Sequence, residues 1–171
     1  MVEKTLADVL TIARRNLPHW EAGGSVYFVT FRSIRGTLPD AALERVEKRI
    51  YIGHGKFFRL YLGVIMPDHV HLIIQPLPSG KFDTALDYPR AIYYTIGEIC
   101  KGVKGASARD INKLLGTSGS VFQDERFDRI LRNEKEYLEK YRYILYNPVK
   151  AGLIEPYEDY RFYLRPPQEA G

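Results

Sequence analysis

The sequence predicts an α+β fold in which helices pack on an antiparallel sheet, and two observations carry this prediction. Segments with strand and helix patterns follow one another in the order β-α-β-β-α-β, which is the ferredoxin-like order. The chain has 171 residues, 45% of them hydrophobic, which suits one globular domain and leaves little room for two. We therefore expect residues 1–171 to form a single domain, with a basic segment at 1–24 and a tail at 155–171.

The first half of the chain predicts three strands and one helix. Residues 26–32 (VYFVTFR) are rich in aromatic and β-branched side chains, which favour a strand. Residues 39–50 begin with proline and place their apolar side chains at helical spacing. Two further apolar runs, at 57–65 and 70–75, flank a turn at 66–68, so we expect them to form a β-hairpin.

The second half predicts two helices separated by a strand. Residues 95–115 have apolar side chains on one helical face, and 127–131 read as the fourth strand. The next segment predicts a helix from Glu134 to about Asn147, which would carry the tyrosine discussed below. Pro148 is expected to stop this helix, because proline has no N–H group and clashes with the preceding turn. The tail is rich in tyrosine and proline, which indicates an extended or disordered end.

Composition favours an intracellular protein that binds an acidic partner. The net charge is +4, which suits nucleic acid without being specific for it. Cys100 is the only cysteine, so no disulfide forms within the chain, as expected in a reducing cytoplasm. The sequence has neither the pattern of a signal peptide nor a run of apolar residues long enough to cross a membrane. We expect a cytoplasmic protein with no membrane partner.

Two histidines are spaced to share one face of a strand. His69 and His71 alternate with Val70, which places the two histidine backbones about 6.5–7 Å apart on the same side. Two imidazoles at this distance can converge on one metal ion, and Asp68 can orient a ring by accepting its second N–H. The position at a strand start suggests a site open to solvent. A bare His-x-His pair is also compatible with histidines that face solvent or bond to the backbone.

The predicted helix before Pro148 places a tyrosine and an asparagine on one face. Tyr143 and Asn147 are four residues apart, whereas Tyr141 lies on roughly the opposite side and Tyr146 about 100° from Asn147. By itself this spacing is more typical of a core tyrosine followed by a helix-capping asparagine.

Two stretches together resemble a known family. "VIMPDHVHLII" (64–74) and "YRYILYNPVKAGLI" (141–154) closely resemble the HUH single-tyrosine transposases, and most of all the branch associated with repetitive extragenic palindromes in bacterial genomes. "LPHWEAGGSVYFVTFR" (17–32) and residues 101–141 agree, so the resemblance runs from about Arg14 to Leu153. The joint match is specific, whereas either motif alone is not.

The resemblance implies a metal-dependent enzyme that cleaves and rejoins single-stranded DNA at hairpin repeats through a 5′-phosphotyrosine. It assigns His69 and His71 as two metal ligands, Asn147 as the third and Tyr143 as the nucleophile. Insertion-sequence relatives commonly have glutamine where Asn147 stands, and the palindrome-associated branch has asparagine. The mixed imidazole and amide set suits Mg²⁺ or Mn²⁺. The active unit would be a monomer or a homodimer.

Basic and aromatic side chains are the candidates for DNA contacts. Such groups bind phosphates and stack on bases, although any single surface charge is more often merely solvated. The candidates are Arg14, Arg15, Trp20, Arg32, Lys101, Lys104 and Lys150.

Three other functions compete with this interpretation. A catalytically silent protein of the same fold would bind single-stranded DNA or hairpins, although all four active residues are present. A plasmid-type replication initiator or relaxase would use the same chemistry but usually has additional domains. A ferredoxin-like RNA-binding domain would carry an RNP-like aromatic signature, which is not evident here.

Overall fold

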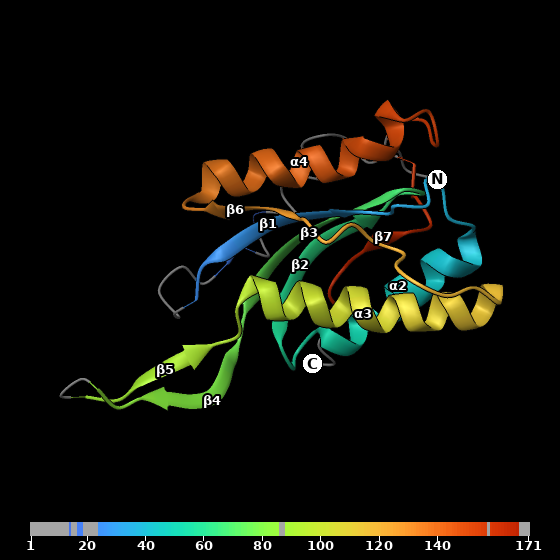
Figure 1. The fold of residues 1–171 in the computed structure, drawn as a ribbon. Coiled ribbons are helices and arrows are strands. Elements are labelled where there is room, and N and C mark those ends of the chain that lie inside the picture. Colours follow the sequence, from blue (N-terminus) through green and yellow to red (C-terminus); the bar gives the residue numbers. More distant parts are fainter. Residues whose placement is uncertain (1–13, 15–16, 19–23, 86–87, 157, 168–171) are drawn as a thin grey trace.

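A computed structural model of the protein shows a five-stranded antiparallel sheet between two layers of helices (Figure 1). It describes residue 14 and the ranges 17–18, 24–85, 88–156 and 158–167. The elements are β1 (Val26–Arg32), α2 (Asp40–Gly53), β2 (Phe58–Ile65), β3 (His69–Pro76), β4 (Pro78–Asp83), β5 (Arg90–Tyr93), α3 (Ile96–Leu115), β6 (Phe127–Leu131), α4 (Glu134–Lys150) and β7 (Tyr163–Leu164). The predicted strands and helices are all present, with bounds that differ by a few residues.

The strand order in the sheet is β6-β1-β3-β2-β7. Every neighbouring pair is antiparallel, and β3 lies between β1 and β2. This is the split β-α-β arrangement that the order of elements predicted, with β7 added at one edge. The strand that carries His69 and His71 is therefore the central one of the five.

Each face of the sheet has its own hydrophobic core. Side chains of α2 and α3 pack with Val29, Leu72 and other residues on one face. Tyr137, Leu138, Tyr141 and Ile144 of α4 pack on the opposite face, against side chains that include Phe28 and Ile73. The alternation of side chains along each strand supplies both faces. Among the described helices, α4, which carries Tyr143, is the one that covers this face of the sheet (Figure 1).

The helix α4 does not stop before Pro148, as the sequence predicted, but continues to Lys150 with the proline inside it. Pro148 is buried, and the helical turn closes beyond it through a hydrogen bond from Ala151 N to Asn147 O of 3.0 Å. Gly152 then adopts a φ of +72°, a left-handed conformation that ends the helix. Asn147 consequently lies inside the last turn of the helix.

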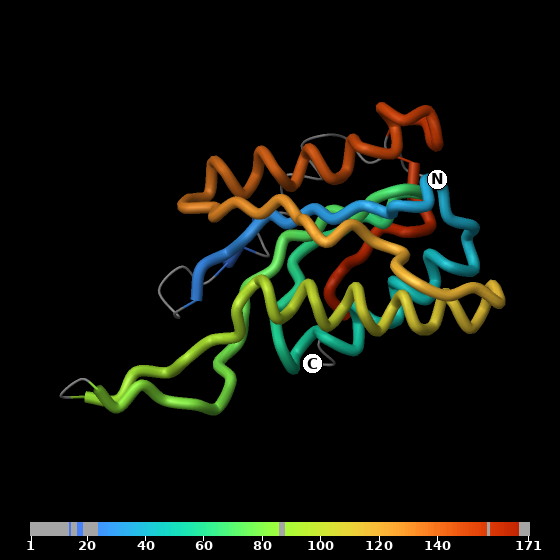
Figure 2. The backbone as a smooth tube through the Cα atoms, in the orientation of Figure 1, coloured from blue at the N-terminus to red at the C-terminus, as the bar shows by residue number. Residues whose placement is uncertain are grey.

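The C-terminal tail contributes a fifth strand that was not predicted. Gly63 and Val64 of β2 pair with Leu164 and Tyr163 of β7. Gly63 allows this close approach, since a Cβ atom there would lie 3.0 Å from Leu164. Figure 2 shows the chain leaving α4, passing the edge of the sheet and ending on the side of α2 and α3. A two-residue strand is too short to leave a periodic pattern in the sequence.

A second unpredicted feature is the two-stranded arm formed by β4 and β5. It projects from the body of the molecule (Figure 1) and carries exposed apolar side chains such as Phe82 and Ile92. No helix in the described part of the chain is long and apolar enough to cross a membrane.

Candidate metal and tyrosine site

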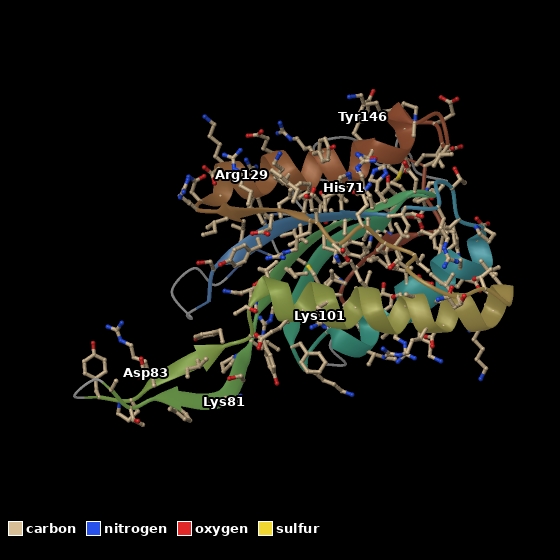
Figure 3. The ribbon with its side chains drawn as sticks, viewed as in Figure 1. His71, Lys81, Asp83, Lys101, Arg129 and Tyr146 are labelled. Carbon is tan, nitrogen blue, oxygen red and sulfur yellow. The ribbon has the colours of Figure 1, made fainter. Side chains whose placement is uncertain are left out.

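The two histidines of β3 face α4 and lie beside each other. In the pairing of β1 with β3, Thr30 is opposite His71 and Arg32 is opposite His69. The histidine ring centroids are 4.7 Å apart, with an interplanar angle of 73°. The predicted shared face is therefore present, and Figure 3 shows His71 between the sheet and α4.

Each histidine has its Nδ1 atom engaged by a neighbouring side chain. His69 Nδ1 lies 2.6 Å from Asp68 Oδ1, the contact proposed from the sequence, and His71 Nδ1 lies 2.6 Å from Thr30 Oγ1. When Nδ1 carries the proton and donates it to these oxygens, each ring keeps a free lone pair on Nε2. This arrangement orients both rings as metal-binding histidines are usually oriented, by a second hydrogen bond.

A third donor atom comes from α4. Asn147 Oδ1 lies 3.4 Å from His69 Nε2, so an amide oxygen approaches the nitrogen that is free to bind a metal. No group of three or more histidine, cysteine, aspartate or glutamate side chains suited to a metal occurs among the described residues. The potential donor groups that lie together here are two imidazoles and one amide.

Burial determines the charge of His71. Its side chain is 4% exposed, so the site is not open to solvent at this position as its place at a strand start suggested. The ring is stacked on Phe28 at 5.4 Å and meets the ring of Tyr143 at 5.2 Å, because α4 covers the strand. Burial, with smaller contributions from His69 and nearby cations, lowers the pKa of His71 to about 3. The ring is therefore neutral at pH 7, which is the state that binds metal.

Asp68 remains ionised beside His69. Its partial burial would by itself raise its pKa, but the hydrogen bond with His69 and the positive charge of Arg32 together lower the pKa below the ordinary value. Arg32 Nη1 lies 3.6 Å from Asp68 Oδ2. An ionised carboxylate accepts the His69 N–H, so it holds this ring in the tautomer described above.

Four tyrosines of α4 have different surroundings. Tyr137 and Tyr141 are buried in the core, and burial raises the pKa of both phenols. Tyr146 is 56% exposed and lies on the outer side of the helix (Figure 3). Tyr143 is 42% exposed, yet its ring touches the rings of His71 and Phe28. Tyr143 is thus the tyrosine of α4 that is both accessible and beside the histidines.

A groove of about 1180 Å³ runs over this part of α4. Tyr143, Tyr146 and Asn147 line it together with the cations Lys135, Lys140 and Lys150. Arg14 lies at the same groove, 3.4 Å from Glu134. A polyanion with flat bases would find both cations and aromatic rings here.

The other candidates for DNA contact are distributed over the molecule. Arg32 is at the end of β1 beside Asp68 and His69. Lys101 and Lys104 lie on α3, across the sheet from the histidines, and Figure 3 labels Lys101 there. Lys104 Nζ donates to the backbone oxygens of Gln123 and Asp124 at 2.8 and 2.9 Å, so it holds the segment before β6. Arg15 and Trp20 lie outside the described residues.

Three residues near the histidines were not identified from the sequence: Thr30, Phe28 and Lys140. Thr30 and Phe28 lie on the same face of the sheet as the two histidines. The alternation of side chains within 26–32 predicts this once β1 is known to pair with β3. Lys140 lies three residues before Tyr143, so helical spacing alone places the two side chains together.

The curated proteins to which the chain is similar bear the name REP-associated tyrosine transposase. No family model matches the chain. A curated protein of Haemophilus influenzae that bears the name REP-associated tyrosine transposase is 28% identical over 98 residues, which are 57% of this chain and 53% of that protein. The chain therefore spans about half the length of this relative. The REP-associated tyrosine transposase of Escherichia coli K12 is 26% identical over 142 residues, covering 82% of this chain and 75% of that protein.

The fold agrees with that of a solved structure. A REP-associated tyrosine transposase bound to a REP hairpin is similar with a TM-score of 0.57 and 21% identity, over 86% of this chain and 80% of that one. The two curated relatives and this fold point the same way as the resemblance of the His69–His71 and Tyr143–Asn147 stretches. The chain is thus similar in sequence to two REP-associated tyrosine transposases and similar in fold to a solved structure of one.

Proposed function

We propose that this protein cleaves and rejoins single-stranded DNA, with Tyr143 as the nucleophile and a divalent metal ion held by His69, His71 and Asn147. The observation that carries the proposal is the convergence of three elements: His69 Nε2 and Asn147 Oδ1 are 3.4 Å apart, and the accessible Tyr143 ring lies against His71. Sequence spacing predicts the His69–His71 pair and the Tyr143–Asn147 pair separately. Because α4 packs on β3, the two pairs lie next to each other.

The donor atoms suit a divalent metal. Both Nδ1 atoms are occupied by Asp68 and Thr30, so the two Nε2 atoms are available as ligands, and Asn147 adds an oxygen. Imidazole favours transition metals and an amide oxygen favours harder ions, so Mn²⁺ fits the whole set and Mg²⁺ its oxygen part. When bound, such an ion supplies Lewis acidity and a template for phosphate oxygens.

The reaction at Tyr143 conserves the phosphodiester bond energy. The phenol oxygen attacks phosphorus, a P–O bond to tyrosine forms and the bond to the 3′-oxygen breaks. The phenol proton passes to solvent and the departing 3′-oxygen takes one up. The products are a 5′-phosphotyrosine and a free 3′-hydroxyl, and the reverse reaction joins strands without ATP. A tyrosine at a groove fits this role, since covalent catalysis needs a side chain that reaches the substrate.

The proposed substrate is a single strand that carries a hairpin. The solved relative is bound to a REP hairpin, and the groove beside Tyr143 combines cations with exposed aromatic rings. Phosphate contacts from Lys150 and Arg14 would set affinity there, and rings such as Tyr146 would stack on unpaired bases. We propose that Arg32, Lys101, Lys104, Arg15 and Trp20 add further contacts, and that the protein acts in the bacterial cytoplasm as a monomer or homodimer.

The test is covalent capture. A panel of single-stranded hairpin oligonucleotides, labelled at the 3′ end, is incubated with the protein and Mn²⁺ and then separated on a denaturing gel. The proposal expects a labelled protein band, because a 5′-phosphotyrosine retains the 3′ fragment. Binding of the same oligonucleotides without any adduct would instead support a catalytically silent DNA-binding protein and overturn the proposal.

A further inference from the structure

An ammonium group lies over the ring of the proposed nucleophile. Lys140 Nζ is 5.3 Å from the centroid of the Tyr143 ring and 5.0 Å from the centroid of the Phe28 ring. Both distances fall within the range of cation–π contacts. The Phe28 and Tyr143 rings are in edge contact with each other, and Phe28 is stacked on His71. The ammonium group of Lys140 therefore lies where α4 packs on β1, close to His71.

Lys140 has no carboxylate partner among the described residues. Every lysine or arginine that forms an ion pair among the described residues is a residue other than Lys140. Glu136 lies one helical turn before Lys140, but its Oε1 lies 3.7 Å from Arg129 Nη2 and its Oε2 accepts from Arg132 N. Glu139 is exposed and lies on the groove. No carboxylate of the described residues therefore neutralises the charge of Lys140, and this charge is available to an anion.

The anion that can reach this charge is one that enters the groove over α4. Lys140 and Tyr143 both line this groove, together with Asn147. Because Lys140 and Tyr143 are three residues apart, their side chains project from one helix face, about 4.5 Å apart along the axis. A phosphate placed for attack by the Tyr143 hydroxyl would lie within reach of a flexible lysine head.

We propose that Lys140 is a catalytic residue that contacts a non-bridging oxygen of the scissile phosphate. The inference rests on the proposed function of Tyr143 and extends it. During attack by the phenol oxygen, the phosphate carries two non-bridging oxygens whose negative charge must be stabilised. A cation in a partly buried site stabilises such charge more than one surrounded by bulk water does. Lys140 takes no part in proton transfer in this role, and it serves both cleavage and rejoining because both pass through the same transition state.

A structural role alone would have different consequences. If Lys140 only packs its stem and head on the two rings, any long side chain at this position would serve. If it holds the phosphate, the positive charge is essential and its effect falls on the chemical step. Lys48 provides the control: it is an exposed lysine on α2, which packs on the opposite face of the sheet, and it does not line the groove.

The experiment measures single-turnover cleavage by the full chain on a 3′-labelled single-stranded hairpin with excess protein and Mn²⁺. Lys140→Gln is expected to lower the maximal rate of adduct formation 10²–10³-fold, the usual loss when one transition-state donor is removed. The protein concentration for half-saturation should change less than about 3-fold. Lys140→Arg should restore much of the rate, and Lys48→Gln should leave it within about 2-fold of the wild type.

A phosphorothioate at the cleaved position separates contact with the phosphate from an indirect effect. Replacing one non-bridging oxygen by sulfur should slow the wild type in one diastereomer, and Lys140→Gln should reduce this difference. A rate in Lys140→Gln within 3-fold of the wild type, or an unchanged phosphorothioate effect in a slowed variant, would overturn the role of Lys140 while leaving Tyr143 in place. Absence of an adduct in the wild type would overturn the proposed function, and the inference with it.

Discussion

Thr30 Oγ1 lies 2.6 Å from Nδ1 of the buried His71, so a hydroxyl on β1 orients a ring on β3. Thr30→Val removes this hydroxyl with little change of volume. We expect metal affinity to fall about 10–100-fold, the usual effect of losing a second hydrogen bond to a ligand. Isothermal titration with Mn²⁺ measures it. Thr30→Ser keeps the hydroxyl and is the control, and equal affinity in Thr30→Val would contradict the orienting role.

Metal dependence is the second prediction. Excess EDTA should stop adduct formation, and added Mn²⁺ or Mg²⁺ should restore it, if His69, His71 and Asn147 hold the ion. Asn147→Ala should raise the Mn²⁺ concentration needed for half-maximal activity, since one of three protein ligands is lost. Lys150→Ala, a change on the same helical turn, is the control. Full cleavage in excess chelator would show that the reaction needs no metal.

The identity of the nucleophile is the third prediction. Tyr143→Phe removes only a hydroxyl and should leave folding and binding of single strands almost unchanged. The covalent adduct should disappear completely. Tyr146→Phe is the matched control, because Tyr146 is also exposed at the groove and should retain most activity. Mass spectrometry of the trapped adduct should find the nucleotide on the peptide with Tyr143, and a different tyrosine there would refute the assignment.

Substrate form is the fourth prediction. The protein should cleave a single strand flanked by a hairpin and leave the perfectly paired duplex of the same sequence intact. The physical reason is access: rings such as Tyr143 and Tyr146 can stack only on unpaired bases. Parallel reactions on both forms with the same label measure the preference. Equal rates on the two forms would contradict it.

The fifth prediction concerns the support of α4 by the tail. The hydroxyl of Tyr163 on β7 donates to the carbonyl of Leu145, two residues before Asn147. Tyr163→Phe should lower the free energy of unfolding by about 1 kcal/mol at pH 7, the typical worth of one hydrogen bond. Thermal or urea unfolding followed by circular dichroism measures it. An unchanged stability would show that the bond contributes nothing.

The contribution of Tyr163 to stability should also depend on pH in the alkaline range. Burial raises the pKa of Tyr163 to about 12, whereas a tyrosine in the unfolded chain has a pKa of about 10. Between these values the unfolded chain loses the proton and the folded chain keeps it. The contribution of Tyr163 is therefore complete below pH 10 and is lost as pH rises toward 12. The stability curves of wild type and Tyr163→Phe should converge above pH 10, and parallel curves would contradict this.

The sequence by itself determined the elements and the local pairs of residues. The alternation of β3 placed His69 and His71 on one face, and helical spacing placed Tyr143 with Asn147, because both relations depend on a single element's period. The order of the elements predicted the sheet topology for the same kind of reason: few arrangements of β-α-β-β-α-β are compatible with short right-handed connections. The resemblance of the two stretches to one family then implied that these pairs are metal ligands and a nucleophile.

Only the tertiary structure decided how the pairs meet. That His71 is buried under Tyr143, that Thr30 holds its Nδ1 and that Lys140 lies over the Tyr143 ring all depend on how α4 packs on β1 and β3. The same holds for Pro148 inside α4 and for the strand β7, where the surrounding core outweighs a local tendency to end or disorder the chain. Local patterns report which face a side chain occupies. The distance between side chains of different elements comes from packing, in which many individually weak contacts among distant residues act together.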